Sequence, residues 1–297
     1  IPCGASEQSI TVGGQTRVFQ LYSPSCTAGG SSRPSATALV ICIHGWMQTS
    51  LWACQAMCNP YAQSHGYIAA CPQGMLDTGP YTLSGWNTDS ESAWSAHDDV
   101  GFMRDMIENI HQRADVQDDL TYVAGFSMGG TMVFRMMCEA SDLISGGAVV
   151  AQPGPYGDMG IGTAHGASWA NCSAARGLPL WASIGTLDRW YTAANATIGW
   201  ETFSRVSLGC QGSAVVESTI EGTRGPIRCQ HFNGCSSATP DRPMSQFCLY
   251  EGLRHFYPST LGRQAGVLTT MVTVLDSTPA AWAFWRRGIT LRPPSAP

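Results

Sequence analysis

Ser127 lies in the segment of the chain whose residue types most clearly indicate chemistry, Gly125-Phe126-Ser127-Met128-Gly129. An apolar, β-prone run from Thr121 precedes this segment, and the helix-compatible residues Met132 to Cys138 follow it. A strand, Gly-x-Ser-x-Gly and a helix, in that order, predict a nucleophile elbow that exposes a serine hydroxyl on a sharp turn. The glycines leave room where neighbouring backbone passes close to the turn. The turn also places the amide of Met128 at a helix N-terminus, where it would stabilise an oxyanion.

The motif is short, so the alternative is a glycine-rich turn with an ordinary surface serine. The elbow requires an acid and a histidine that follow the serine in that order. Asp188 closely follows a predicted buried strand, where a carboxylate can hold a histidine tautomer. His255 follows the last predicted strand in a glycine-containing loop. We therefore predict Ser127, Asp188 and His255 as the catalytic residues. The structural alternatives are a turn cap for Asp188 and a packed loop histidine for His255.

A second oxyanion donor is expected before the nucleophile in the chain. The strand Ala38 to Ile43 ends in His44-Gly45-Trp46, and the glycine lets the backbone turn sharply over the strand end. We predict that the amide of Trp46 is this donor. The alternative is an ordinary strand-to-loop glycine beside a packed histidine.

The chain resembles the secreted esterases grouped as feruloyl esterases and polyhydroxybutyrate depolymerases, from about residue 15 to residue 258. The resemblance is carried by His44-Gly45-x-x-Gln48, Trp86 with Asp98-Asp99-Val100-Gly101-Phe102, Gly125-Phe126-Ser127-Met128-Gly129-Gly130, Gly185-x-x-Asp188 and His255-x-x-Pro258. It implies an α/β-hydrolase fold, the triad named above and a position for Trp86 near the substrate cleft. Gly85 and Arg254 depart from the family pattern, and these departures concern substrate choice. Trp46, Trp86, Trp190 and Tyr191 would form an apolar cleft, or would instead belong to the core.

Strand-like and helix-like segments alternate along the chain, which predicts an α/β fold with a mostly parallel, doubly wound sheet and helices on both faces. We expect one catalytic domain over residues 1–290 and a Pro-rich tail over residues 291–297. The expected strands lie at 8–23 (a hairpin), 38–43, 67–71, 121–126, 146–150, 178–184, 214–220 and 246–250, and the expected helices at 52–65, 98–113, 194–206 and, interrupted near Pro279, 261–285.

Composition excludes several classes of partner. Only 12% of the 297 residues are charged, and the net charge is −5. The sequence also contains no run of basic residues that would indicate binding to nucleic acid or to an anionic membrane. No apolar run reaches the length of a membrane span. We expect no cofactor, no metal and a monomer.

Twelve cysteines, an even number, favour a secreted, disulfide-stabilised protein. The first residue is Ile1, so we expect that an N-terminal segment has been removed or omitted. Sequons at Asn171 and Asn195 agree with this interpretation. Zinc is the rival interpretation of Cys54 and Cys58, but no matching pair completes a site. Pairing cannot be deduced from sequence; Cys3–Cys26 and a pair within the Cys210 to Cys248 group are our guesses.

Three functions are therefore open. The first is a feruloyl or related carboxylesterase that acts on plant cell-wall esters, with a polymer-linked substrate. The second is a polyester depolymerase. The third is a non-catalytic binding protein on a hydrolase scaffold, against which an intact triad argues. A peptidase is weaker still, since nothing in the sequence marks a peptide subsite.

Overall fold

The computed structural model of the chain describes residues 1, 3–24, 38–77, 82–88, 97–154, 172, 177–221, 225–232, 234–235, 244–258, 270–271 and 277–286. The predicted Pro-rich tail, the sequon residue Asn171 and the cysteine Cys26 lie outside these residues.

Ten strands form one sheet, in the order β1-β2-β4-β3-β7-β8-β9-β12-β11-β10. The six central strands, from β4 to β12, run parallel to one another, and antiparallel strands complete both edges. The strands are β1 (Gly4–Val12), β2 (Gln15–Ser23), β3 (Ala38–Ile43), β4 (Tyr67–Pro72), β7 (Thr121–Phe126), β8 (Gly146–Val150), β9 (Leu180–Gly185), β10 (Val215–Ile220), β11 (Ile227–Phe232) and β12 (Ser245–Tyr250). Two further sheets pair β5 (Leu76–Asp77) with β6 (Thr82–Leu83) and β13 (Tyr257–Pro258) with β14 (Thr270–Met271).

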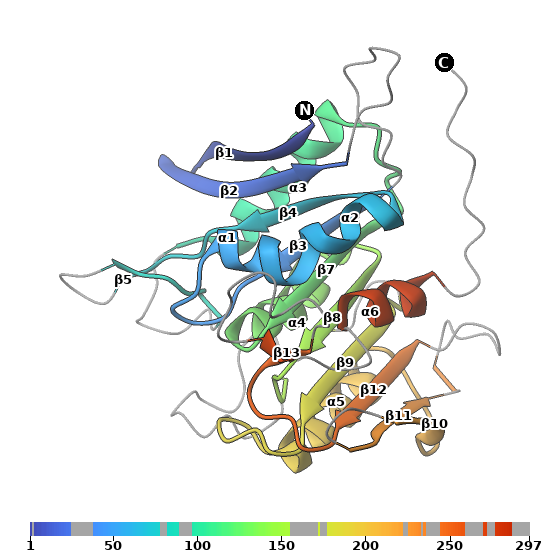
Figure 1. Cartoon of the computed structure of the whole chain (residues 1–297). Helices are drawn as coiled ribbons and strands as arrows, with labels where there is room; N and C mark the ends of the chain where they lie inside the picture. The colour runs from blue at the N-terminus through green and yellow to red at the C-terminus, as the bar shows by residue number, and fades with distance from the viewer. Residues whose placement is uncertain are drawn as a thin grey trace.

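Helices cover both faces of the large sheet (Figure 1). One face carries α1 (Ser50–Ala53), the π-helix η1 (Cys54–Cys58), α2 (Asn59–His65) and α6 (Ser277–Trp285). The other face carries α3 (Asp99–Arg113), α4 (Met128–Glu139) and α5 (Ala193–Val206). The predicted α/β class, with a mostly parallel sheet between two helical layers, is confirmed.

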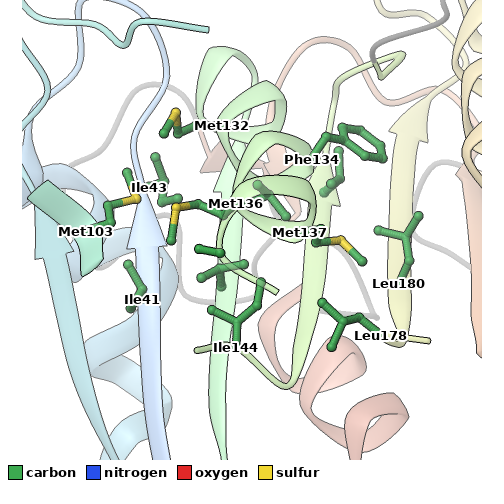
Figure 2. Packing of buried hydrophobic residues seen from close by; sticks show 14 of the residues in the cluster. Ile41, Ile43, Met103, Met132, Phe134, Met136, Met137, Ile144, Leu178 and Leu180 are labelled. Atoms are coloured by element: carbon green, nitrogen blue, oxygen red, sulfur yellow. The ribbon is translucent and has the colours of Figure 1, made fainter. Parts of the chain in front are cut away.

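Strand β3 shows why the sheet must be covered on both sides. All six of its residues are buried, and successive side chains enter opposite layers because side chains alternate across a strand. Ile41 and Ile43 pack with the face that α4 covers, where Met132 and Met136 point toward them (Figure 2). Val40 belongs to the core on the opposite face. Truncating a buried Met such as Met136 to Ala would cost about 2–5 kcal/mol of folding free energy.

Three segments differ from the prediction. The expected helix over residues 52–65 contains the π-helical turn η1. The segment expected as loop or hairpin after residue 222 contains β11, which pairs with both β10 and β12. The expected helix over residues 261–285 is wrong at Thr270–Met271, which form β14, and Pro279 does not interrupt α6 but lies in its first turn. Proline fits there because the first helical amides have no intrahelical acceptor.

Disulfides join the strands to their neighbours. Cys42 pairs with Cys58 and Cys54 with Cys71, which ties η1 to β3 and β4, and this pairing removes the zinc interpretation of Cys54 and Cys58. The remaining described pairs are Cys138–Cys172, Cys210–Cys235 and Cys229–Cys248. Two of them fall within the Cys210 to Cys248 group, as predicted. Cys3 is also disulfide-bonded. No free cysteine and no helix able to cross a membrane occurs among the described residues.

Candidate active site

Ser127 occupies the sharp turn between β7 and α4, with a left-handed φ of 53° and a ψ of −123°. The turn is possible only because glycines flank it. A Cβ atom on Gly125 would lie 2.1 Å from the carbonyl oxygen of Gly129, and one on Gly129 would lie 2.2 Å from the carbonyl oxygen of Ile43. The serine is half-buried at the end of a central strand. This is the local geometry that the motif predicted.

His255 connects Ser127 to Asp188. Its Nε2 lies 2.9 Å from the Oγ of Ser127, and its Nδ1 lies 2.7 Å from the Oδ2 of Asp188. A carboxylate can only accept, so Nδ1 carries the proton and Nε2 is free to accept from the serine hydroxyl. The structure thus brings together the three residues predicted from chain order, in the arrangement that a general base and its orienting acid require.

The sheet topology explains why Asp188 and His255 meet. Asp188 follows β9 and His255 follows β12, and these adjacent parallel strands end at the same edge of the sheet. The carboxylate of Asp188 is fully buried, and its second oxygen, Oδ1, accepts from the amides of Trp190 at 2.9 Å and Tyr191 at 3.0 Å. These bonds fix the carboxylate, which in turn fixes the orientation of the imidazole.

A second loop, after β3, lies against the nucleophile. A Cβ atom on Gly45 would lie 3.2 Å from the Cβ of Ser127, which shows how closely the two turns approach. The amide of Gly45 donates to Oε1 of Gln48 at 2.8 Å, so it is already occupied. The next amide, that of Trp46, and the amide of Met128 have no hydrogen-bond acceptor among the described residues. The amide of Met128 follows Ser127 directly and that of Trp46 follows Gly45, so both N–H groups remain available as the predicted oxyanion donors.

His44 holds this loop as a neutral imidazole. Burial lowers the pKa of His44 to about 4, although its hydrogen bond to Gly45 opposes the shift. Nδ1 donates to the carbonyl of Gly45 at 2.7 Å, and Nε2 accepts from the amide of Gly74 at 3.0 Å. A neutral ring is required for this pairing, because a protonated ring could not accept from Gly74.

Trp86 is buried against the loop that follows β3. The residue is only 1% exposed, and its Nε1 donates to the carbonyl of His44 at 2.7 Å. Its neighbour Asn87 is fixed on both sides, since its amide donates to Asp99 at 2.7 Å and its carbonyl accepts from Arg135 at 2.6 Å. The prediction that Trp86 contacts substrate is therefore corrected to a structural role.

The other predicted aromatic residues differ in exposure and in their contacts with His255. Trp190 is 55% exposed and its ring centroid lies 6.2 Å from that of His255, while Trp46 is 44% exposed. Tyr191 is 8% exposed and contacts His255 edge to face at 5.6 Å. Burial, and then the charge of Asp188, raise the pKa of Tyr191, so this phenol remains protonated. Of the two exposed indoles, that of Trp190 thus lies beside the half-buried imidazole of His255.

Three glutamines for which the sequence predicted no role form hydrogen bonds with the loops around Ser127. Gln48 receives the amide of Gly45, as described above. Gln73 accepts from the amide of Ser50 at 2.8 Å and donates to the hydroxyl of Ser84 at 2.8 Å. Gln152 donates to the carbonyl of Ser127 at 3.4 Å and to the hydroxyl of Thr131. Of the three, only Gln48 could have been found from the sequence, because it stands in the motif that carries the family resemblance.

No group of histidine, cysteine and acidic side chains in the described part of the chain could hold a metal ion. Ser127, His255 and the nearby backbone amides could supply a hydroxyl nucleophile, a base and hydrogen-bond donors.

Comparison with solved structures gives the fold a name. The acetyl xylan esterase from Aspergillus awamori superimposes with a TM-score of 0.64 over 94% of this chain and 98% of that chain, at 15% sequence identity. The chain has the α/β-hydrolase fold. An S-formylglutathione hydrolase from Agrobacterium tumefaciens shares this α/β-hydrolase fold with a TM-score of 0.56, 12% identity and coverage of 84% and 88%.

Sequence comparison finds a match to part of the chain. The protein named "Putative esterase NocK" from Nocardia uniformis subsp. tsuyamanensis is 27% identical over 148 residues, which are 48% of this chain. The match covers 40% of that protein's length. No protein-family model matches the chain.

Proposed function

We propose that this α/β hydrolase is a serine carboxylesterase that removes acyl groups from plant cell-wall polysaccharide. The observation that carries the proposal is the continuous hydrogen-bonded path from Ser127 through His255 to Asp188, at 2.9 and 2.7 Å. The esterases among the similar proteins support it.

In the proposed mechanism, Ser127 attacks the ester carbonyl while His255 removes the serine proton. Asp188 holds the imidazole in the required tautomer and stabilises its protonated form. The amides of Trp46 and Met128 stabilise the oxyanion, each by about 3 kcal/mol. His255 then returns the proton to the leaving alcohol, and a water molecule activated by the same imidazole hydrolyses the acyl-enzyme.

Two acyl groups are candidates. The family resemblance favours a hydroxycinnamoyl group such as feruloyl, for which the exposed indoles of Trp46 and Trp190 offer apolar surface. The structural neighbour that acts on acetyl xylan favours an acetyl group. Turnover of methyl ferulate and of acetylated xylan, measured with the same preparation, shows which of the two acyl groups the enzyme removes.

A polyester depolymerase is the second candidate function. The observation that favours it is a set of exposed apolar side chains on the loops that carry the triad and oxyanion residues: Trp46, Met47, Leu187 and Trp190. Such a surface would bind an apolar polymer. Release of soluble acids from polyhydroxybutyrate film, without turnover of methyl ferulate or acetylated xylan, would replace the first proposal by this one.

A non-catalytic binding protein is the third candidate. This candidate predicts that the wild type hydrolyses neither ester nor polyester, and that Ser127→Ala gives the same result as the wild type in both assays. Turnover of any ester that Ser127→Ala abolishes excludes it.

We also propose that the protein is secreted, monomeric and free of cofactors. Five described disulfides support secretion, because such bonds persist in oxidising compartments. Mass spectrometry without reduction should find few or no free thiols in protein recovered from culture medium. Mostly free thiols would contradict secretion.

A further inference from the structure

Two exposed arginines flank the candidate triad on its histidine side. Arg189 directly follows Asp188, and Arg254 directly precedes His255; both are exposed. Their loops lie side by side, since the amide of Leu187 donates to the carbonyl of Leu253 at 2.9 Å. Adjacent loops therefore carry the two arginines, and each arginine is next in the chain to a residue that would perform the reaction.

Neither guanidinium forms an ion pair with a residue that the structure describes. Arginines elsewhere do: Arg17 pairs with Asp99, Arg104 with Asp142 and Arg135 with Glu139. Asp188, next to Arg189 in the chain, is buried and already binds two amides and His255. Glu251, three residues before Arg254, is half-buried and accepts from the hydroxyl of Thr186 at 3.2 Å. Neither arginine is thus paired with a carboxylate of the described residues, so both guanidinium groups can bind an anionic group of a substrate. A guanidinium group remains charged and binds carboxylates through two parallel hydrogen bonds.

The position of the arginines determines which part of an ester they would contact. His255 returns a proton to the leaving alcohol, so the alcohol part of the ester must lie on the histidine side of Ser127. Trp190 is exposed on the same side, 6.2 Å from the imidazole. The negative face of an indole suits the polarised C–H groups of a sugar ring. Trp190 and the loops that carry the two arginines thus lie on the side of Ser127 where the alcohol part would bind.

Resting on the proposed esterase function, we propose that the alcohol part of the substrate carries a carboxylate, as in a glycan that contains uronic acid, and that Arg189 and Arg254 bind this carboxylate. The site would then select acylated acidic polysaccharide over acylated neutral polysaccharide. The acyl group remains a separate question, which the substrate panel above addresses.

The test compares two substrates with the same acyl group, acetylated methyl glucuronide and acetylated methyl glucoside. For the wild type, kcat/KM should be higher for the glucuronide, and the ratio should fall as sodium chloride is raised, because salt screens exposed charges. Arg189→Gln and Arg254→Gln should each lower the ratio about two- to fivefold, the effect of an exposed ion pair. Arg228→Gln is the matched control, since Arg228 is exposed on β11 and makes no ion pair with a described residue; its ratio should equal that of the wild type.

A wild-type ratio of one, or a ratio that the double variant Arg189→Gln/Arg254→Gln retains, would overturn the proposal. A third substrate, methyl hydrogen succinate, carries its carboxylate in the acyl part; a preference for it that depends on the arginines would show that the alcohol-side assignment is wrong. Binding of methyl glucuronide and methyl glucoside to the Ser127→Ala variant gives a readout that needs no turnover. Tighter binding of the glucuronide, lost in the double variant, would support the carboxylate site even if neither acetyl ester is hydrolysed, whereas equal binding would overturn it.

Discussion

The backbone amide of Leu187 donates a 2.9 Å hydrogen bond to the carbonyl of Leu253, and this bond joins the two loops that carry Asp188 and His255. A Cβ atom on Gly185 would lie 2.1 Å from the same carbonyl oxygen, so the loops are in close contact at the strand ends. The imidazole and the carboxylate are therefore held together by main-chain packing as well as by their own hydrogen bond.

Asp188→Asn should lower kcat for p-nitrophenyl acetate by about 10³–10⁴-fold, because an amide at this position can donate to His255 and favour the wrong tautomer. Asp142→Asn is the matched control. Asp142 also lies between Ser127 and His255 in the chain, but it is exposed and pairs with Arg104. Less than a tenfold loss for Asp188→Asn would contradict its assignment as the triad acid.

His44 should make the folded state sensitive to acid. Its pKa is about 4 when folded, against 6.5 for an unperturbed histidine, so the unfolded chain binds more protons between these two values. Stability from this residue is complete above about pH 6.5 and is lost as the pH falls toward 4, by about 3 kcal/mol in all. His44→Gln should therefore show a shallower fall in the free energy of unfolding, measured by urea titration between pH 7 and pH 4. An unchanged slope would mean that His44 is not buried as a neutral ring.

Gly125→Ala should abolish activity, whereas Gly14→Ala should not. A Cβ atom on Gly125 would overlap the carbonyl of Gly129, which displaces the turn that carries Ser127. Gly14 has a φ of 82° with open space around it, so alanine there costs only the backbone strain, about 1 kcal/mol. Thermal denaturation and ester turnover of both variants test this difference. An active Gly125→Ala variant would contradict the elbow geometry.

Trp86 and Trp190 should respond differently to substitution. Trp86→Phe removes the donor to the carbonyl of His44, and leaving that carbonyl unpaired should cost about 1–3 kcal/mol of stability. Trp190→Ala should leave the melting temperature close to that of the wild type and raise KM for polymeric substrate, since this indole is exposed. A raised KM with unchanged stability for Trp86→Phe would instead indicate that Trp86 contacts substrate.

The buried strands were predictable because both of their faces require apolar side chains. The predicted strands at 38–43, 121–126 and 146–150 match β3, β7 and β8. The order of Ser127, Asp188 and His255 was also predictable, because each follows a central strand and parallel strands end at one edge of the sheet. These features could be predicted because each depends on residues close together in the chain: the apolar residues of a strand, or the residue that follows it.

The failures arose where distant contacts decide the outcome. Trp86 stands in a long polar loop, and nothing near it in sequence shows that its ring packs against Gly74 and His44. Thr270–Met271 were predicted as helix, yet they pair with Tyr257–Pro258. Gln152 follows β8 with no motif around it, and its contact with Ser127 depends on how β7 and β8 are paired.

The most direct measurement of the central claim is turnover of p-nitrophenyl acetate by Ser127→Ala, with Ser213→Ala, an exposed serine away from the site, as its control. Circular dichroism of both variants should match that of the wild type. We predict that Ser127→Ala loses at least about 10³-fold in kcat, because the nucleophile is removed, and that Ser213→Ala retains wild-type turnover. Wild-type turnover by a folded Ser127→Ala variant would contradict the catalytic role of Ser127.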